Sequence, residues 1–88
     1  MRGRAPFLPP RDLRLPGFPA AIPVKSKTIR PGGNLRRRWK SNDGTILEWD
    51  YQHGTVEAYD RRGRHIGEFD PWNGAKRKDA DPTRSVEP

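Results

Sequence analysis

The chain has 88 residues, which is enough for one small domain with a thin hydrophobic core. Only 31% of the residues are hydrophobic, and 18 Lys and Arg against 11 Asp and Glu give a net charge of +7. This balance predicts a polyanionic partner: nucleic acid, an acidic protein or an anionic membrane surface. Cysteine is absent, which excludes a disulfide framework and a thiolate zinc site, and no apolar run is long enough to predict a membrane-spanning helix.

The first third of the chain is rich in proline, with seven of the ten prolines within residues 1–31. Proline fixes φ and lacks an N–H, so this spacing forbids a regular helix or a central strand. We therefore expect residues 1–34 to form a proline-rich arm or linker, loose over the first ten residues and partly packed on a sheet from about Leu15. One helical turn around residues 11–15 is the short helix that this spacing permits.

Residues 25–40 form a basic segment without any acidic residue. Within it, alternation over residues 35–40 places Leu35, Arg37 and Trp39 on one face and three basic residues on the other, which predicts a first strand. Such a run of cations is often a solvated face, and beside carboxylates it is also a plausible phosphate track. The basic side chains of this strand are Arg36, Arg38 and Lys40.

Residues 46–59 predict a β-hairpin, because two segments rich in β-branched and aromatic residues flank a tight turn. If His53 and Gly54 form the turn, Asp50 lies opposite Glu57; a turn one residue earlier shifts the register but keeps the two faces. Alternation places carboxylates on one face and apolar side chains on the other. The first face carries Glu48, Asp50, Glu57 and Tyr59, and the second carries Leu47, Trp49, Val56 and Ala58.

Two more short strands are expected after the hairpin, one over residues 64–69 and one beginning at Lys76, Arg77 and Lys78. Turn signals separate all of these segments. The predicted fold class is mainly β (α+β): a small, highly twisted antiparallel sheet of four to six short strands over residues 35–88.

Asp50, His53 and Glu57 are the residues with spacing suited to chemistry. One His and two carboxylates make a weak metal site, and no Ser or Cys has the setting of an activated nucleophile. RNA cleavage without a metal or cofactor fits best, because the ribose 2′-OH supplies the nucleophile and the protein supplies a base, an acid and a cation. From the residues alone, however, a generic nucleic-acid-binding module is the stronger interpretation, since a turn histidine and a paired glutamate are usually not catalytic.

Residues 36–84 resemble the cytotoxic ribonuclease domain of the E-type colicins that cut ribosomal RNA. The arm resembles this family only around residues 15–19. The shared residues occur in order and with matched turns, and they include Arg38, Trp39, Glu48, Trp49, Asp50, Gln52, His53, Gly54, Glu57, Tyr59, His65, Gly67, Phe69, Asp70, Pro71, Gly74, Asp81, Pro82 and Arg84.

The resemblance implies a twisted antiparallel sheet with a short N-terminal helix, and metal-free cleavage of small-subunit (16S) ribosomal RNA in the decoding centre. It implies Glu57 as general base, His53 as general acid and Asp50 as the group that orients His53, although the labels of base and acid are exchangeable. Arg84 would stabilise the phosphate, and Lys78 would assist. The expected substrate-binding residues are Lys78, Arg36, Arg38, Lys40, Lys76 and Arg77.

The chain departs from the family at Leu47, where the family has a tyrosine near the active site, and in a turn after Tyr59 that is one residue shorter. The resemblance further implies a toxin module of a larger bacteriocin or contact-dependent inhibitor. Its partners would be the ribosome and a small acidic immunity protein, and it would act in the target-cell cytoplasm after release by the producer. The alternatives are a non-catalytic RNA- or ribosome-binding module and a metal-dependent nuclease.

Overall fold

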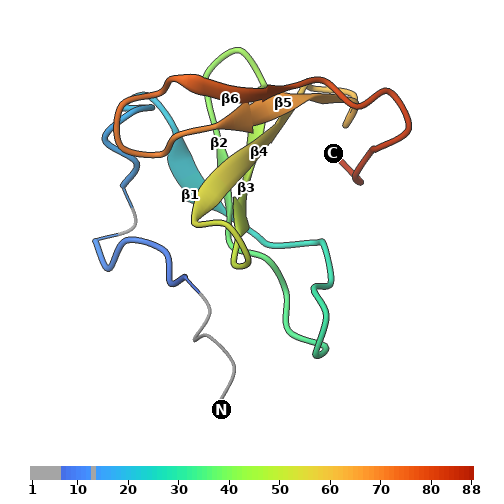
Figure 1. Ribbon diagram of the computed structural model, residues 1–88, viewed down its shortest axis with the longest axis horizontal. Coiled ribbons are helices and arrows are strands. Elements are labelled where there is room, and N and C mark those ends of the chain that lie inside the picture. The colour runs from blue at the N-terminus through green and yellow to red at the C-terminus, as the bar shows by residue number, and fades with distance from the viewer. Residues whose placement is uncertain (1–6, 13) are drawn as a thin grey trace.

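The computed structural model describes residues 7–12 and 14–88, and these residues form a six-stranded antiparallel sheet. Each strand pairs with its neighbours in the sequence, and Figure 1 shows β5 and β6 running steeply across the other strands, so the sheet is strongly twisted. The predicted mainly β fold is therefore confirmed. The strands are β1 (Ile22–Val24), β2 (Arg38–Lys40), β3 (Ile46–Asp50), β4 (Thr55–Tyr59), β5 (His65–Phe69) and β6 (Lys76–Asp79).

Residues 7–12 and 14–88 contain no helix. Arg11 and Asp12 form a turn, and Leu13 lies outside the described residues, as does the arm before Phe7. The helical turn around residues 11–15 is therefore not found in the described part of the chain, where prolines on both sides leave too few residues to form a helix. No described helix is long and apolar enough to cross a membrane.

The proline-rich arm contributes an edge strand and two core residues. β1 pairs with β2, and Pro23 lies opposite Trp39. An edge position tolerates proline because no further strand needs its missing N–H. Leu15 and Ala21 are fully buried against the sheet. The arm thus covers one end of the core, while the boundary at residue 34 stays a prediction.

The β3–β4 hairpin has the two faces that the alternation predicts. Its register is the one expected for a turn centred one residue before His53–Gly54, the alternative given above. Asp50 lies opposite Thr55 and Glu48 opposite Glu57, so the register with Asp50 opposite Glu57 is wrong. The physical reason is a turn of four residues, closed by the Gly54 N–H donating to the Asp50 carbonyl at 2.8 Å. Gly54 has a φ of 70°, a conformation that glycine adopts without strain.

The apolar face of the sheet forms the core. Trp39 and Trp49 pack with ring centroids 6.4 Å apart, and the Phe18 ring meets the Phe69 ring edge-on at 6.0 Å. Leu47 is fully buried here, so the departure from the family at this position lies on the face away from the carboxylates. The buried members of the core are Leu15, Ala21, Trp39, Leu47, Trp49, Val56 and Ala58.

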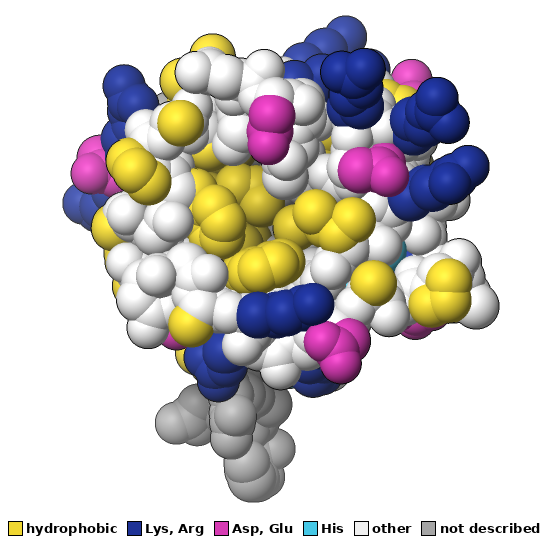
Figure 2. Space-filling view, turned by 90° about the horizontal axis from the view of Figure 1, so that it is seen from above, with side chains coloured by type: hydrophobic (Ala, Val, Ile, Leu, Met, Phe, Trp, Pro, Cys, Tyr) yellow, Lys and Arg dark blue, Asp and Glu magenta, His cyan; other side chains and the backbone are white. Residues whose placement is uncertain are grey.

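The surface separates apolar and basic side chains. Figure 2, which views the molecule from above relative to Figure 1, shows hydrophobic side chains gathered in a hollow. Lys and Arg side chains lie around its rim and gather most densely on one side. On this face the positive charge of the chain is therefore carried at the periphery.

A buried ion pair lies on the polar face between β2 and β3. Arg38 Nη2 lies 2.7 Å from Glu48 Oε2, and both side chains are at most 1% exposed. Arg38 Nε and the Thr28 hydroxyl donate to the same oxygen at 3.0 and 2.6 Å. A buried charge requires this kind of hydrogen-bonded partner to remain ionised inside a protein.

Arg38→Ala is expected to lower the free energy of unfolding by about 3–5 kcal/mol, because it leaves the Glu48 charge buried without its ion-pair partner. Urea unfolding followed by tryptophan fluorescence measures this change. Lys40→Ala, an exposed position of the same strand, is the matched control and should stay within about 0.5 kcal/mol of the wild type. Equal unfolding midpoints for the two variants would contradict the structural role of the pair.

Candidate active site

Charged side chains form a row across the sheet. The strand registers place Arg38 opposite Glu48, Glu48 opposite Glu57, Glu57 opposite Glu68, and Glu68 opposite Lys78. Like charges on directly opposite residues destabilise a sheet. Three adjacent glutamates with a cation at each end are therefore an arrangement that folding alone does not favour.

Arg38 belongs to the interior end of this row. Its guanidinium group is buried against Glu48 and therefore does not reach a substrate phosphate, so the structure does not support the expectation that Arg38 binds substrate. The sequence pattern predicts a solvated strand face for Arg38, because its contacts with Thr28 and Glu48 join residues that lie ten positions apart in the sequence. Thr28 donates to Glu48 and closes the site from one side.

Glu57, at the centre of the row, contacts the imidazole of His65 and the guanidinium group of Arg84. His65 Nε2 lies 2.8 Å from Glu57 Oε1, and Arg84 Nη1 lies 3.3 Å from the same oxygen. Burial raises the pKa of the Glu57 carboxyl above its usual value, and the Glu68 charge adds to this rise against the opposing effects of His65 and Arg84. A buried carboxyl with a raised pKa is a stronger proton acceptor than an ordinary one.

The hydrogen bonds of His65 define its tautomer. The Asp81 N–H donates to His65 Nδ1 at 2.9 Å, so this nitrogen is unprotonated and Nε2 carries the hydrogen that Glu57 accepts. Arg84 also donates to the Tyr59 hydroxyl at 3.1 Å, which holds its guanidinium group beside Glu57. His65 is thus a fixed donor to the carboxylate.

Asp50 and His53 form the second pair. His53 Nδ1 lies 2.8 Å from Asp50 Oδ2, while Asp50 Oδ1 accepts the N–H groups of Gln52 and His53 at 2.8 and 3.1 Å. Burial alone would raise the pKa of Asp50, but the hydrogen bonds from the His53 ring and from these two N–H groups outweigh it and lower the pKa below its usual value. The ionised Asp50 therefore orients the half-exposed His53 ring.

These groups line one open cavity of about 1140 Å³ on the polar face of the sheet. The cavity brings together the four residues expected to be catalytic, and its lining mixes carboxylates with four cations that are suited to bind phosphate. It is also bounded by Arg30, whose guanidinium carbon lies 3.8 Å from the centroid of the Tyr51 ring. Its charged lining comprises Arg30, Arg36, Asp50, His53, Glu57, His65, Glu68, Lys78, Asp79, Asp81 and Arg84.

Besides the buried Arg38, three of the expected substrate-binding residues lie outside this lining. Lys40 is exposed at the end of β2, Lys76 pairs with Asp79 at 3.2 Å, and Arg77 pairs with Asp70 at 3.3 Å. Lys78 and Arg36 do line the cavity. The basic residues thus divide into two that face the cavity and three on the surrounding surface.

Sequence reasoning did not assign His65 or Glu68 to the site. The resemblance includes His65 only as a position shared with the family, and the sequence patterns predict no role for Glu68. Both face Glu57 because β5 pairs with β4, with a register shift between Ala58 and Tyr59. Alternation along residues 64–69 offers a partial signal, but the shift makes the shared face unreadable from spacing alone.

Asp50, His53 and Glu68 each offer one ligand atom within 4.8 Å of the other two, so three donors for a divalent cation lie close together. The pair geometry opposes this use, because the Asp50 carboxylate already accepts two backbone hydrogen bonds and the His53 ring. The hydrogen bond to Asp50 involves His53 Nδ1, and no described residue forms a hydrogen bond with His53 Nε2, so Nε2 is open to a proton or to a cation.

The chain is similar to known proteins over most of its length. A family model described as Cytotoxic matches residues 8–87. The chain is 45% identical over 80 residues to colicin E3 of Escherichia coli, covering 88% of this chain and 14% of that protein. It is 43% identical over 65 residues to colicin-E6 of E. coli (70% of this chain, 12% of that protein) and 37% identical over 83 residues to cloacin of E. coli (91% and 15%). The chain thus spans less than a sixth of the length of each relative.

Glu57→Gln is expected to raise the free energy of unfolding at pH 7 and to leave it unchanged at pH 3. A carboxyl whose pKa is raised by folding ionises more easily in the unfolded chain, so the wild type loses stability as the pH rises from the usual value of 4.5 through the folded-state value. The glutamine cannot ionise and escapes this loss. Urea midpoints between pH 3 and pH 8 measure the difference.

Asp50→Asn is the matched control with the opposite sign. The lowered pKa of Asp50 stabilises the fold above the usual carboxyl value, and this stabilisation is lost as the pH falls through the folded-state value. The asparagine variant should therefore be less stable than the wild type at pH 7. A Glu57→Gln variant that is also less stable at pH 7 would contradict the raised pKa of Glu57.

Proposed function

The chain belongs to the Cytotoxic family, the ribonuclease domain of the E-type colicins, and we propose that it cleaves 16S ribosomal RNA of the small subunit in the decoding centre. Such a break stops translation. The observation that carries the proposal is the convergence of Glu57, held by His65 and Arg84, with the Asp50–His53 pair in one open cavity. The reaction needs no metal and no cofactor, because proton transfer and charge stabilisation are all it requires.

Glu57 is the general base in this proposal. His65 and Arg84 both lie against Oε1, and no described residue donates to Oε2, which is therefore available to accept a proton. Glu57 takes the proton of the ribose 2′-OH as the 2′-oxygen attacks the adjacent phosphorus. The raised pKa of Glu57 favours this transfer.

His53 is the general acid. The ionised Asp50 accepts the Nδ1 hydrogen of the ring and stabilises its positive form, so Nε2 is free to give a proton to the departing 5′-oxygen. The phosphorus–oxygen bond to the 5′-oxygen breaks as the bond to the 2′-oxygen forms. The product carries a 2′,3′-cyclic phosphate, and DNA is inert because it lacks the 2′-OH.

Arg84 stabilises the charge that develops on the phosphate, since its guanidinium group lies beside Glu57 and is held by the Tyr59 hydroxyl. Lys78 and Arg36 line the same cavity and contact neighbouring phosphates. Lys40, Lys76 and Arg77 contribute a surrounding positive surface that docks on the ribosome. Arg38 has no place in this set, because it is buried.

The domain works as the toxin module of a larger bacteriocin or contact-dependent inhibitor, released by the producing bacterium and active in the cytoplasm of the target cell. A small acidic immunity protein protects the producer. The net charge of +7 supports such a partner, because opposite charge accelerates association.

The experiment is cleavage of intact bacterial ribosomes in the presence of a chelator, with RNA ends mapped by primer extension. The wild-type domain should make one discrete break in the small-subunit RNA, and Glu57→Gln should reduce its rate by about a hundredfold or more while ribosome binding, measured by co-sedimentation, persists. Glu87→Gln is the control, because this side chain is 75% exposed and lies outside the cavity.

Two results would overturn the proposal. Tight ribosome binding by the wild type without any break would identify a non-catalytic binding module. Cleavage that the chelator abolishes and added Mg²⁺ restores would identify a metal-dependent nuclease.

A further inference from the structure

Glu68 is a buried carboxylate in the cavity with no role in the mechanism so far. It lies on β5, opposite Glu57 on β4 and opposite Lys78 on β6, and it is 5% exposed. Its side chain lines the cavity that holds the Asp50–His53 pair. Its charge therefore acts on the reacting groups.

The three glutamates of the row differ in their partners. Glu48 accepts hydrogen bonds from Arg38 and Thr28, and Glu57 is held by His65 and Arg84. In the described part of the chain, no group donates a hydrogen bond to the Glu68 carboxylate. Its ion-pair partner there is the Lys78 ammonium at 4.0 Å, on a side chain that is 64% exposed. Glu68 also lies directly opposite Glu57, and like charges in this arrangement destabilise a sheet, so stability of the fold does not account for this glutamate.

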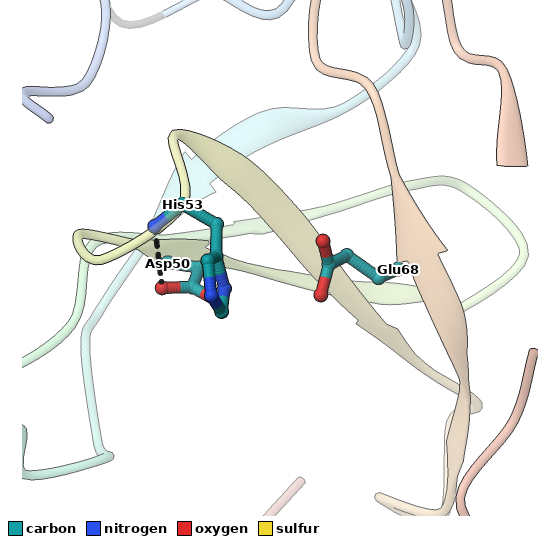
Figure 3. Close-up of side chains that lie close together, drawn as sticks. All are labelled: Asp50, His53 and Glu68. Atoms are coloured by element: carbon teal, nitrogen blue, oxygen red, sulfur yellow. Dashed lines mark hydrogen bonds and ion pairs between the residues drawn. The ribbon is translucent and has the colours of Figure 1, made fainter. Parts of the chain in front are cut away.

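The geometry relates Glu68 to His53. One oxygen of Glu68 lies within 4.8 Å of both a ring nitrogen of His53 and an oxygen of Asp50, and Figure 3 shows the Glu68 carboxylate pointing toward the His53 ring. The ring is anchored through Nδ1 to Asp50, and no described residue forms a hydrogen bond with Nε2. A protonated ring has two N–H donors, of which Asp50 accepts one.

We propose that Glu68 is a positioning residue that, together with Asp50, holds the His53 ring in its protonated form over the cavity. The proposal rests on the function proposed above, in which His53 is the general acid. Two carboxylates close to the ring favour its positively charged form, which is the form that gives a proton to the departing 5′-oxygen. Glu68 thus acts through His53 and touches no reacting atom itself.

The other charges around Glu68 define the expected effects. Glu57 faces it from β4 and Lys78 from β6, while Asp50 and His53 face it from β3 and the following turn. Removing the negative charge of Glu68 destabilises the protonated ring and also withdraws one cause of the raised pKa of Glu57. Both groups then titrate at lower pH. The more distant charges of the cavity are Arg30, Arg36, Asp79, Asp81 and Arg84.

The first test is an NMR titration of the His53 ring protons in the free domain, which does not require cleavage activity. Glu68→Gln should move the titration midpoint to lower pH by about 0.5–1 unit. Glu68→Asp, which keeps the charge, should stay closer to the wild type. Lys78→Ala removes an exposed cation instead and should move the midpoint in the opposite direction.

A midpoint that is the same in Glu68→Gln and the wild type would overturn the proposal, and so would equal shifts in Glu68→Gln and Glu68→Asp. If Glu68→Gln does not fold, the Lys78→Ala shift decides, since an unchanged or lower midpoint in that variant contradicts the electrostatic role of Glu68.

The second test is the pH dependence of ribosomal RNA cleavage. The cleavage rate of the wild type should depend on pH in a bell shape, because Glu57 must be ionised and His53 protonated. Glu68→Gln should shift both limbs of this profile to lower pH, with a maximal rate within a fewfold of the wild type. A lower maximum with unmoved limbs would indicate a merely structural role and contradict the proposal. If the wild type itself makes no break, the proposed function fails, while the titration of His53 still tests the electrostatic role of Glu68.

Discussion

Three glutamates on neighbouring strands, buried side by side, are the constraint around which the polar face of this sheet is built. Glu48, Glu57 and Glu68 repel one another, and the fold tolerates them because cations or an imidazole lie beside each pair. Arg38 neutralises the first from inside, and Lys78 meets the last from the rim. Burial raises the pKa of the central carboxyl, Glu57, and the charge of Glu68 adds to this rise. A site with this electrostatic cost is the expected setting of a proton acceptor.

The two faces of the sheet divide the work of the chain. The apolar face carries the tryptophans Trp39 and Trp49 and closes with Leu15 and Ala21 from the arm, so a small hydrophobic content still yields a continuous core. The polar face is free to hold destabilising charge. A domain of 88 residues has only enough apolar side chains for a thin core, so the core and the site occupy opposite sides of the same strands.

Local sequence patterns predicted the features that depend on residues close in the sequence, such as the two faces of the β3–β4 hairpin. Alternation over residues 46–59 predicted the correct faces for Glu48, Asp50 and Glu57, because side chains in a strand alternate and a turn of even length keeps the faces of the two strands matched. The register was not predictable, since it depends on a four-residue turn. Two features depend on contacts between residues far apart in the sequence and were therefore not predictable from local patterns. Arg38 is buried against Glu48 and Thr28, and His65 reaches Glu57 through a shifted register between β4 and β5. The roles of the site residues were assigned from the family resemblance, because the spacing of residues alone does not assign a role to each.

The central claim is that the fold keeps Glu57 as a proton acceptor with a raised pKa. Carbon-13 NMR of the side-chain carboxyl groups, recorded on the free domain as a function of pH, measures this directly. The account predicts that the Glu57 carboxyl titrates above the usual value of 4.5, while the Asp50 carboxyl titrates below its usual 3.8. A Glu57 carboxyl that titrates at or below 4.5 would contradict it, because His65 and Arg84 would then outweigh burial and leave a weak base.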